Sequence, residues 1–213
     1  MSIISKFNKS VNRKGSKNVV CARAGGANTT LLLAAHFAKR NTKFGGGGKR
    51  GRAKIPYDFA SFRGYLYFLD KKFGEIIRYP YLKNFEWGSA QLWLAKEEKK
   101  ASGAKSLAVD GSVWLLAKNN SLSRYYAGRL QEKINLEIFP EPKEFKKIFT
   151  SATLPYLYLL EPVQKRIIIL DKKGQIIKQF QSQKFDNLLD FAISEDGKTI
   201  YLLNGLKLYK INF

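Results

Sequence analysis

Short apolar runs separated by polar turns fill residues 55–213. The runs are about five residues long and rich in β-branched and aromatic side chains, which favour strands. Asp, Asn and Gly are frequent between them, and these residues adopt the backbone conformations that tight hairpins need. The pattern predicts antiparallel β-structure, with one short helix expected in a loop at residues 90–101. The runs that we interpret as strands are 65–69, 75–79, 112–116, 156–160, 166–170, 199–203 and 206–209.

The apolar runs recur at a regular interval. Alignment on the aromatic residues Tyr67, Trp114, Tyr158 and Tyr201 gives separations of 47, 44 and 43 residues. This spacing is typical of four-stranded propeller blades. Each aligned run is preceded and followed by another short strand, and some units add an outer fourth strand, as at 176–181. The preceding strands are expected at 59–62, 106–109, 147–150 and 189–193, and the following ones at 76–79, 123–126, 166–170 and 206–211.

Two segments resemble the hairpins of a known repeat family. Residues 192–203, Ala-Ile-Ser-Glu-Asp-Gly-Lys-Thr-Ile-Tyr-Leu-Leu, are similar to the strand–turn–strand of bacterial β-propeller repeats of the NHL, YVTN and TolB kind. Residues 168–176 resemble the hairpin of the same repeats, whereas the Trp-Asp dipeptide of WD repeats is missing from the sequence. The resemblance covers about 155 residues and implies an all-β fold, a partial or small β-propeller of about four blades.

The repeat units are expected near 55–101, 102–142, 143–185 and 186–213. Closed propellers use about four to eight blades, so three arrangements stay open: a four-bladed ring, a half that dimerises, or a C-terminal fragment of a longer protein, which we favour. Three consecutive isoleucines at 167–169 make one strand apolar on both faces. Such a strand belongs between neighbouring blades.

Positive charge is concentrated before the repeats. The chain holds 38 Lys and Arg against 17 Asp and Glu, a net charge of +21, and residues 1–54 contribute 13 basic residues and no acid. Four consecutive glycines at 45–48 add to the prediction of a mostly disordered basic tail or linker. The apolar stretch at 29–38 is too short to span a membrane. It makes no convincing signal peptide, although a targeting or membrane-surface segment stays an alternative.

An acid-free basic segment resembles the flexible arms that bind nucleic-acid backbones. Nucleic acid, an anionic membrane surface, or no partner at all are therefore alternatives for residues 1–54. The candidate anion contacts are Lys39, Arg40, Lys43, Lys49, Arg50, Arg52 and Lys54.

The sequence predicts no catalytic, cofactor or metal site. One cysteine, Cys21, and one histidine, His36, exclude a structural zinc site and an intrachain disulfide. The Gly48-Lys49 pair lacks the flanking residues of a phosphate-binding loop. Turn carboxylates are expected to cap the backbone, and turn lysines to be solvated. These turn residues are Asp70, Asp171, Asp196 and the pairs Lys71-Lys72 and Lys172-Lys173.

These observations favour a non-catalytic module that binds an unknown protein or ligand at the propeller rim. The resemblance implies a sensor or interaction part of a bacterial signalling or envelope protein. The alternative from another class is a nucleic-acid-binding protein that uses the basic tail. Self-association through open blade edges is a further expectation, and an enzyme ranks third because no residue constellation supports one.

Overall fold

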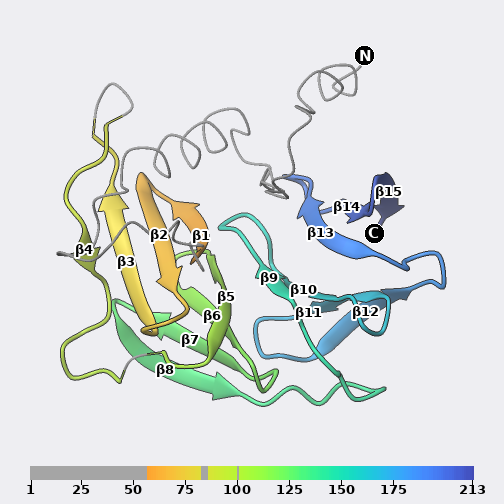
Figure 1. Cartoon of the computed structure of the whole chain (residues 1–213), viewed down its shortest axis with the longest axis horizontal. Coiled ribbons are helices and arrows are strands. Elements are labelled where there is room, and N and C mark those ends of the chain that lie inside the picture. Colours follow the sequence, from red (N-terminus) through yellow and green to blue (C-terminus); the bar gives the residue numbers. More distant parts are fainter. Residues whose placement is uncertain (1–56, 83–85, 100) are drawn as a thin grey trace, which may run out of the picture.

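The computed structural model describes residues 57–82, 86–99 and 101–213, and all of its regular secondary structure there is β. Four antiparallel sheets follow one another along the chain and are arranged as a four-bladed propeller. In Figure 1 the sheets lie along an arc, with the first and the last sheet at its two ends. The expected tail at 1–54 and its candidate anion contacts lie outside the described residues, as do Cys21, His36 and Gly48-Lys49.

Each sheet is a meander in which neighbouring strands are consecutive in the chain. The first blade contains β1 (Tyr57–Phe62), β2 (Tyr65–Asp70), β3 (Glu75–Pro80) and β4 (Gln91–Leu92). The second blade contains β5 (Ala104–Val109), β6 (Val113–Ala117), β7 (Leu122–Tyr126) and β8 (Arg129–Ile134). The third blade contains β9 (Lys147–Phe149), β10 (Leu157–Glu161), β11 (Arg166–Leu170) and β12 (Ile176–Gln181), and the fourth contains β13 (Leu188–Ile193), β14 (Thr199–Asn204) and β15 (Lys207–Asn212).

The predicted strands are confirmed to within a few residues, but the short helix expected at 90–101 is wrong. That segment instead forms the two-residue strand β4 and a series of turns, as far as it is described. Two of its backbone donors bind carbonyls outside the segment: the Trp93 N–H donates to the Ile76 carbonyl on β3 at 2.8 Å, and the Ala95 N–H donates to the Gly128 carbonyl in the turn between β7 and β8 at 3.0 Å. Tertiary hydrogen bonds thus override the helical composition of the segment.

Apolar side chains hold adjacent blades together face to face. One cluster joins the first and second blades, one joins the second and third, and one joins the third and fourth. Strand β11 contributes to two of them: Ile168 packs toward the second blade, whereas Ile167 and Ile169 pack toward the fourth. The isoleucine run therefore lies between blades, as its two apolar faces predict.

The innermost strands carry a polar residue at one equivalent position in every blade. In each blade this polar residue pairs with the residue that lies two positions after the aligned aromatic residue of the next strand. The four polar residues, in blade order, are Asp58, Ser106, Lys147 and Asp190. The repeat noted in the sequence thus places four polar side chains at the same point of four successive blades.

These polar side chains connect each blade to the next. The Asp58 Oδ2 atom accepts hydrogen bonds from the Ser106 Oγ at 2.6 Å and from the Leu107 N–H at 2.8 Å. The Ser106 Oγ accepts one from the Ile148 N–H at 3.2 Å. Lys147 then forms an ion pair with Asp190 of the fourth blade. A chain of polar contacts therefore fixes the relative position of all four blades.

Removing the first contact of this chain is expected to loosen the first blade. In an Asp58→Ala variant the buried Leu107 N–H loses the carboxylate acceptor, which should lower the free energy of unfolding by about 1–3 kcal/mol. An Asp58→Asn variant keeps an acceptor oxygen and should retain most of the stability. Urea unfolding measures both, and equal stability of the alanine variant and the parent chain would contradict this role of Asp58.

Candidate functional site

A surface groove of about 440 Å³ lies between the second and third blades. Its lining comes from three strands of the second blade and from the turn between β11 and β12 of the third. The lining residues are Trp114, Arg124, Glu132, Lys172 and Lys173.

Strand register places the residues of the second blade in one row. Trp114 on β6 pairs with Arg124 on β7, which in turn pairs with Glu132 on β8. Directly opposed residues of antiparallel strands project from the same face of a sheet. Trp114 is 2% exposed and forms the floor of the groove, and its indole Nε1 donates to both carboxylate oxygens of Asp110 at 3.1 Å.

Lys172 crosses from the third blade to the second. Its Nζ donates to the Asp110 Oδ2 at 2.6 Å and also contacts the Thr150 hydroxyl. The ammonium group lies 5.6 Å from the centre of the Trp114 ring, within the range of a cation–π contact. Burial lowers the pKa of Lys172, while the Asp110 carboxylate counteracts this by favouring the charged form. The interpretation of Lys172 as a solvated turn lysine is therefore wrong, because its side chain joins two blades.

The groove presents an excess of cationic groups. The Arg124 guanidinium lies 5.9 Å from the Trp114 ring centre and 3.4 Å from the Glu132 carboxylate. The Nε of Arg124 is buried and has no hydrogen-bond partner within the described residues. Lys173 at the rim is exposed. Lys172 is held by Asp110 at 2.6 Å, whereas Arg124 contacts Glu132 more loosely at 3.4 Å. Arg124 and the exposed Lys173 are therefore the cations most open to a bound anionic group.

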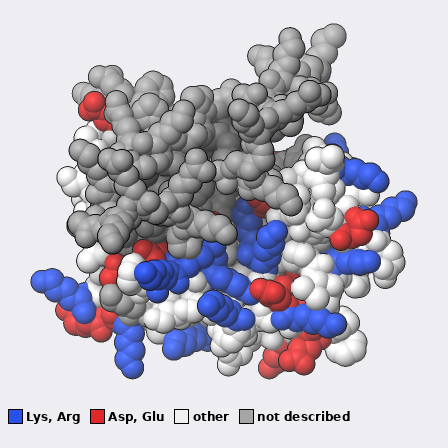
Figure 2. Space-filling view, in the orientation of Figure 1, with Lys and Arg blue, Asp and Glu red and all other residues white. Residues whose placement is uncertain are grey.

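Charged side chains also cover the surface outside the groove. Figure 2 shows Lys and Arg over much of the visible described surface, with Asp and Glu among them.

The turn carboxylates cap the backbone as the sequence predicts: Asp70 accepts from the Lys72 N–H at 2.9 Å, and Asp171 accepts from the Lys173 N–H at 2.8 Å. Asp196 likewise accepts from the backbone N–H two residues later, at 3.0 Å.

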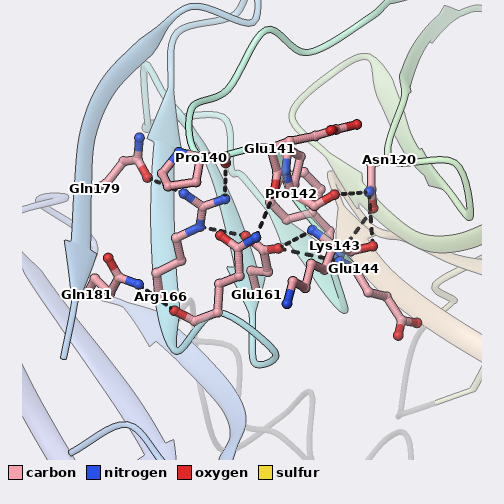
Figure 3. Close-up of polar contacts among 12 residues, drawn as sticks. Asn120, Pro140, Glu141, Pro142, Lys143, Glu144, Glu161, Arg166, Gln179 and Gln181 are labelled. Atoms are coloured by element: carbon pink, nitrogen blue, oxygen red, sulfur yellow. Dashed lines mark hydrogen bonds and ion pairs between the residues drawn. The ribbon is translucent and has the colours of Figure 1, made fainter. Parts of the chain in front are cut away.

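A fully buried ion pair lies at the opposite end of the third blade. The Arg166 Nε donates to the Glu161 Oε2 at 2.6 Å, and the other guanidinium nitrogens donate to the Gln179 side chain at 2.8 Å and to the Pro140 carbonyl at 2.7 Å. The second oxygen of Glu161 accepts from the Lys143 N–H at 2.6 Å. Figure 3 shows the Arg166 and Glu161 side chains pointing toward one another beside Pro140.

These contacts hold the segment between β8 and β9 in place. Asn120 fixes the same segment from the second blade, because its side chain donates to the Pro142 carbonyl at 3.0 Å and accepts from the Phe145 N–H at 3.1 Å. The Arg166 and Glu161 side chains are both 0% exposed. The cluster therefore stabilises the connection between two blades and offers no surface to a ligand.

Neither the groove nor any binding residue of the repeats was predicted from the sequence. One signal was present: Asp110 precedes Trp114 by four residues across a tight turn, which brings a carboxylate close to the indole N–H. The partner Lys172 lies 62 residues away from Asp110, so only the stacking of blades brings it to the site.

Over the described ranges, no group of three or more His, Cys, Asp or Glu residues could hold a metal ion. The same part of the chain contains no helix that is long and apolar enough to cross a membrane.

Comparison with known proteins identifies the fold. No family model and no curated protein matches the sequence, whereas many solved structures resemble it. One is a nidogen/laminin complex, with a TM-score of 0.50 and 15% identity over 66% of this chain and 55% of that chain. Another is Myxococcus xanthus glutaminyl cyclase, with a TM-score of 0.50 and 12% identity over 73% of each chain. A streptogramin B lyase matches with a TM-score of 0.49 and 17% identity over 70% of this chain and 47% of that chain.

These similarities concern the fold alone. The chain spans about half the length of the lyase and nidogen/laminin chains that it matches. The matched glutaminyl cyclase is named as an enzyme, and one fold supports unrelated functions, so the likeness carries no activity to this chain. The four stacked meanders and these likenesses agree, and the chain is a β-propeller protein.

Proposed function

We propose that this chain is a non-catalytic binding module whose groove between the second and third blades docks an acidic segment of a partner protein. The observation that carries the proposal is the grouping of Arg124, Lys172 and the exposed Lys173 around one groove, whose lining includes one carboxylate, Glu132. Carboxylate–guanidinium hydrogen bonds are among the strongest in proteins. An acidic side chain in the groove would accept from the half-exposed Arg124 guanidinium and would lie close to the Lys173 ammonium group.

The shape of the positive region supports a short acidic segment over a long polyanion. The cations of the groove are grouped at one boundary between blades, and the Glu132 carboxylate lies beside them. A nucleic-acid backbone needs a stripe of cations that follows successive phosphates. The resemblance to bacterial propeller repeats agrees with a sensor or interaction role for such a module.

The proposal predicts that cations of the groove determine affinity for an acidic peptide. A fluorescent peptide with several glutamates is titrated with the full chain, and binding is followed by fluorescence anisotropy. An Arg124→Gln/Lys173→Gln variant should bind about tenfold more weakly, since it loses about 1.4 kcal/mol of charge-assisted interaction. A Lys178→Gln/Lys210→Gln variant changes the net charge equally at exposed positions that do not line the groove, and it should bind like the parent chain. Equal weakening by both variants would reduce the effect to net charge and contradict a specific groove.

The basic segment 1–54 supports a second candidate, nucleic-acid binding, because it carries 13 basic residues and no acid. Changing its seven candidate anion contacts, Lys39, Arg40, Lys43, Lys49, Arg50, Arg52 and Lys54, to glutamine in the full chain should then abolish retention on DNA at low salt. Unchanged retention would remove this candidate and would leave the groove proposal untouched.

A further inference from the structure

A buried hydroxyl without a partner in the described residues lies beside a second pocket, at the boundary between the third and fourth blades. Tyr158 on β10 is 0% exposed, and its Oη has no hydrogen-bond partner in the described part of the chain. Buried polar groups in folded proteins nearly always have a partner, so an orphaned one requires an explanation. The pocket beside it has a volume of about 220 Å³.

The walls of this pocket combine aromatic and polar groups. Tyr156 and Phe213 form one side, with ring centres 5.7 Å apart in an edge-to-face contact. The turn from Asp196 to Lys198 forms the other side. One oxygen of Asp196, Oδ1, accepts from the Ser194 Oγ at 2.5 Å and from the Lys198 N–H at 3.0 Å. The Lys198 side chain is exposed at the rim.

The equivalent position of the second blade has a hydrogen-bond acceptor that the third blade lacks. Trp114 aligns with Tyr158 in the repeat, and its N–H donates to Asp110, four residues earlier. The residue four positions before Tyr158 is Leu154, which is buried and has no acceptor side chain. The repeat therefore supplies an acceptor beside the second blade's aromatic residue and none beside that of the third.

The Tyr158 hydroxyl can donate a hydrogen bond to an acceptor on a ligand. Burial raises the pKa of Tyr158 to about 12, so its hydroxyl is protonated at neutral pH and can donate. A cavity of about 150 Å³ can hold a benzene ring, and this pocket is larger. An acid with a single aromatic ring would match the aromatic wall with its ring. Its carboxylate would match the Tyr158 hydroxyl and the Lys198 ammonium group at the rim.

We propose that the pocket between the third and fourth blades binds a small aromatic carboxylate through the Tyr158 hydroxyl, with Tyr156 and Phe213 packed against the ring of the ligand. This site is separate from the groove at Arg124 and does not depend on the function proposed for it.

The test uses benzoate as the probe and the full chain as the protein. Isothermal titration should detect benzoate binding, whereas benzylamine, which has the same ring but a cation in place of the acceptor, should not bind. A Tyr158→Phe variant removes only the hydroxyl, and it should weaken benzoate binding at least about tenfold. Tyr201→Phe changes the equivalent tyrosine of the fourth blade, outside the pocket, and should bind like the parent chain.

Thermal unfolding of the unliganded Tyr158→Phe variant distinguishes a ligand-binding hydroxyl from one that is needed for folding. Because the hydroxyl has no internal partner, its removal should leave the midpoint unchanged or raise it. A lower midpoint would show that the hydroxyl is satisfied inside the protein and would overturn the proposal. The absence of benzoate binding, or equal binding by Tyr158→Phe and the parent chain, would overturn it as well.

Discussion

Replacing Glu161 with alanine is expected to lower the free energy of unfolding by about 3–5 kcal/mol. The substitution leaves the fully buried Arg166 guanidinium without its carboxylate partner, and an unpaired buried charge is far more costly than a lost surface ion pair. It also removes the acceptor of the Lys143 N–H, which helps to fix the segment between β8 and β9. Urea unfolding monitored by tryptophan fluorescence measures the loss.

A double variant separates the ion pair from the space that it fills. Glu161→Leu combined with Arg166→Met removes both charges and keeps apolar volume, so it should be more stable than the Glu161→Ala variant. If Glu161→Ala costs less than about 1 kcal/mol, as is typical of exposed pairs, the two side chains are hydrated in solution and the description of this cluster as buried is wrong.

Replacing Gly128 with alanine is expected to cost about 3 kcal/mol, for two separate reasons. Its φ of +79° lies in the left-handed region, which disfavours a residue with a Cβ by about 1–2 kcal/mol. An added Cβ would also collide with the Trp93 carbonyl oxygen and lie 3.0 Å from the Ala95 nitrogen. Both are backbone atoms, so no side chain can move to make room.

Gly64 is the matched control for this prediction. Its φ of +76° is nearly the same, but nothing lies within 4 Å of the position that a Cβ would occupy. Gly64→Ala should therefore show only the conformational cost of about 1–2 kcal/mol. Equal losses for the two variants in urea unfolding would mean that the turn between β7 and β8 does not approach the segment after β4 as closely as described.

The strands and their stacking could be predicted from the sequence because they depend on local pattern. The alternation around Tyr67, Trp114, Tyr158 and Tyr201 is a property of each unit, and repetition reinforces it. The isoleucines at 167–169 likewise indicate a strand with two apolar faces, and the structure places those faces in two separate clusters.

The outer strand β12 is predicted at 176–181, but the outer strand β8 and the polar contacts between blades could not be predicted in the same way. Strand β8 carries mostly exposed polar residues, Arg129 to Lys133, which resemble a loop when the neighbouring strand is unknown. Lys172 has the sequence context of an ordinary hairpin lysine, and only the position of the second blade gives it Asp110 as a partner. Burial of the Glu161–Arg166 pair depends on contacts with a segment about 20 residues earlier in the chain. The sequence around the pair does not indicate these contacts.

Both proposed sites lie where blades meet, so both depend on a fixed relation between neighbouring sheets. The groove takes its cations from the second and third blades, and the Tyr158 pocket takes its walls from the third and fourth. Neither site would exist in an isolated meander. Contacts between the innermost strands therefore have to hold the blades in a fixed position relative to one another.

Amide hydrogen exchange of the full chain, measured by NMR at Leu107 and Ile148, tests this claim most directly. Each of these N–H groups donates to a side chain of the preceding blade, so its protection reports on contact between blades. Both amides should exchange as slowly as those of the central strands β6 and β10. Exchange at Leu107 and Ile148 as fast as at an exposed strand edge, with β6 and β10 still protected, would show that the blades move independently and would contradict the account.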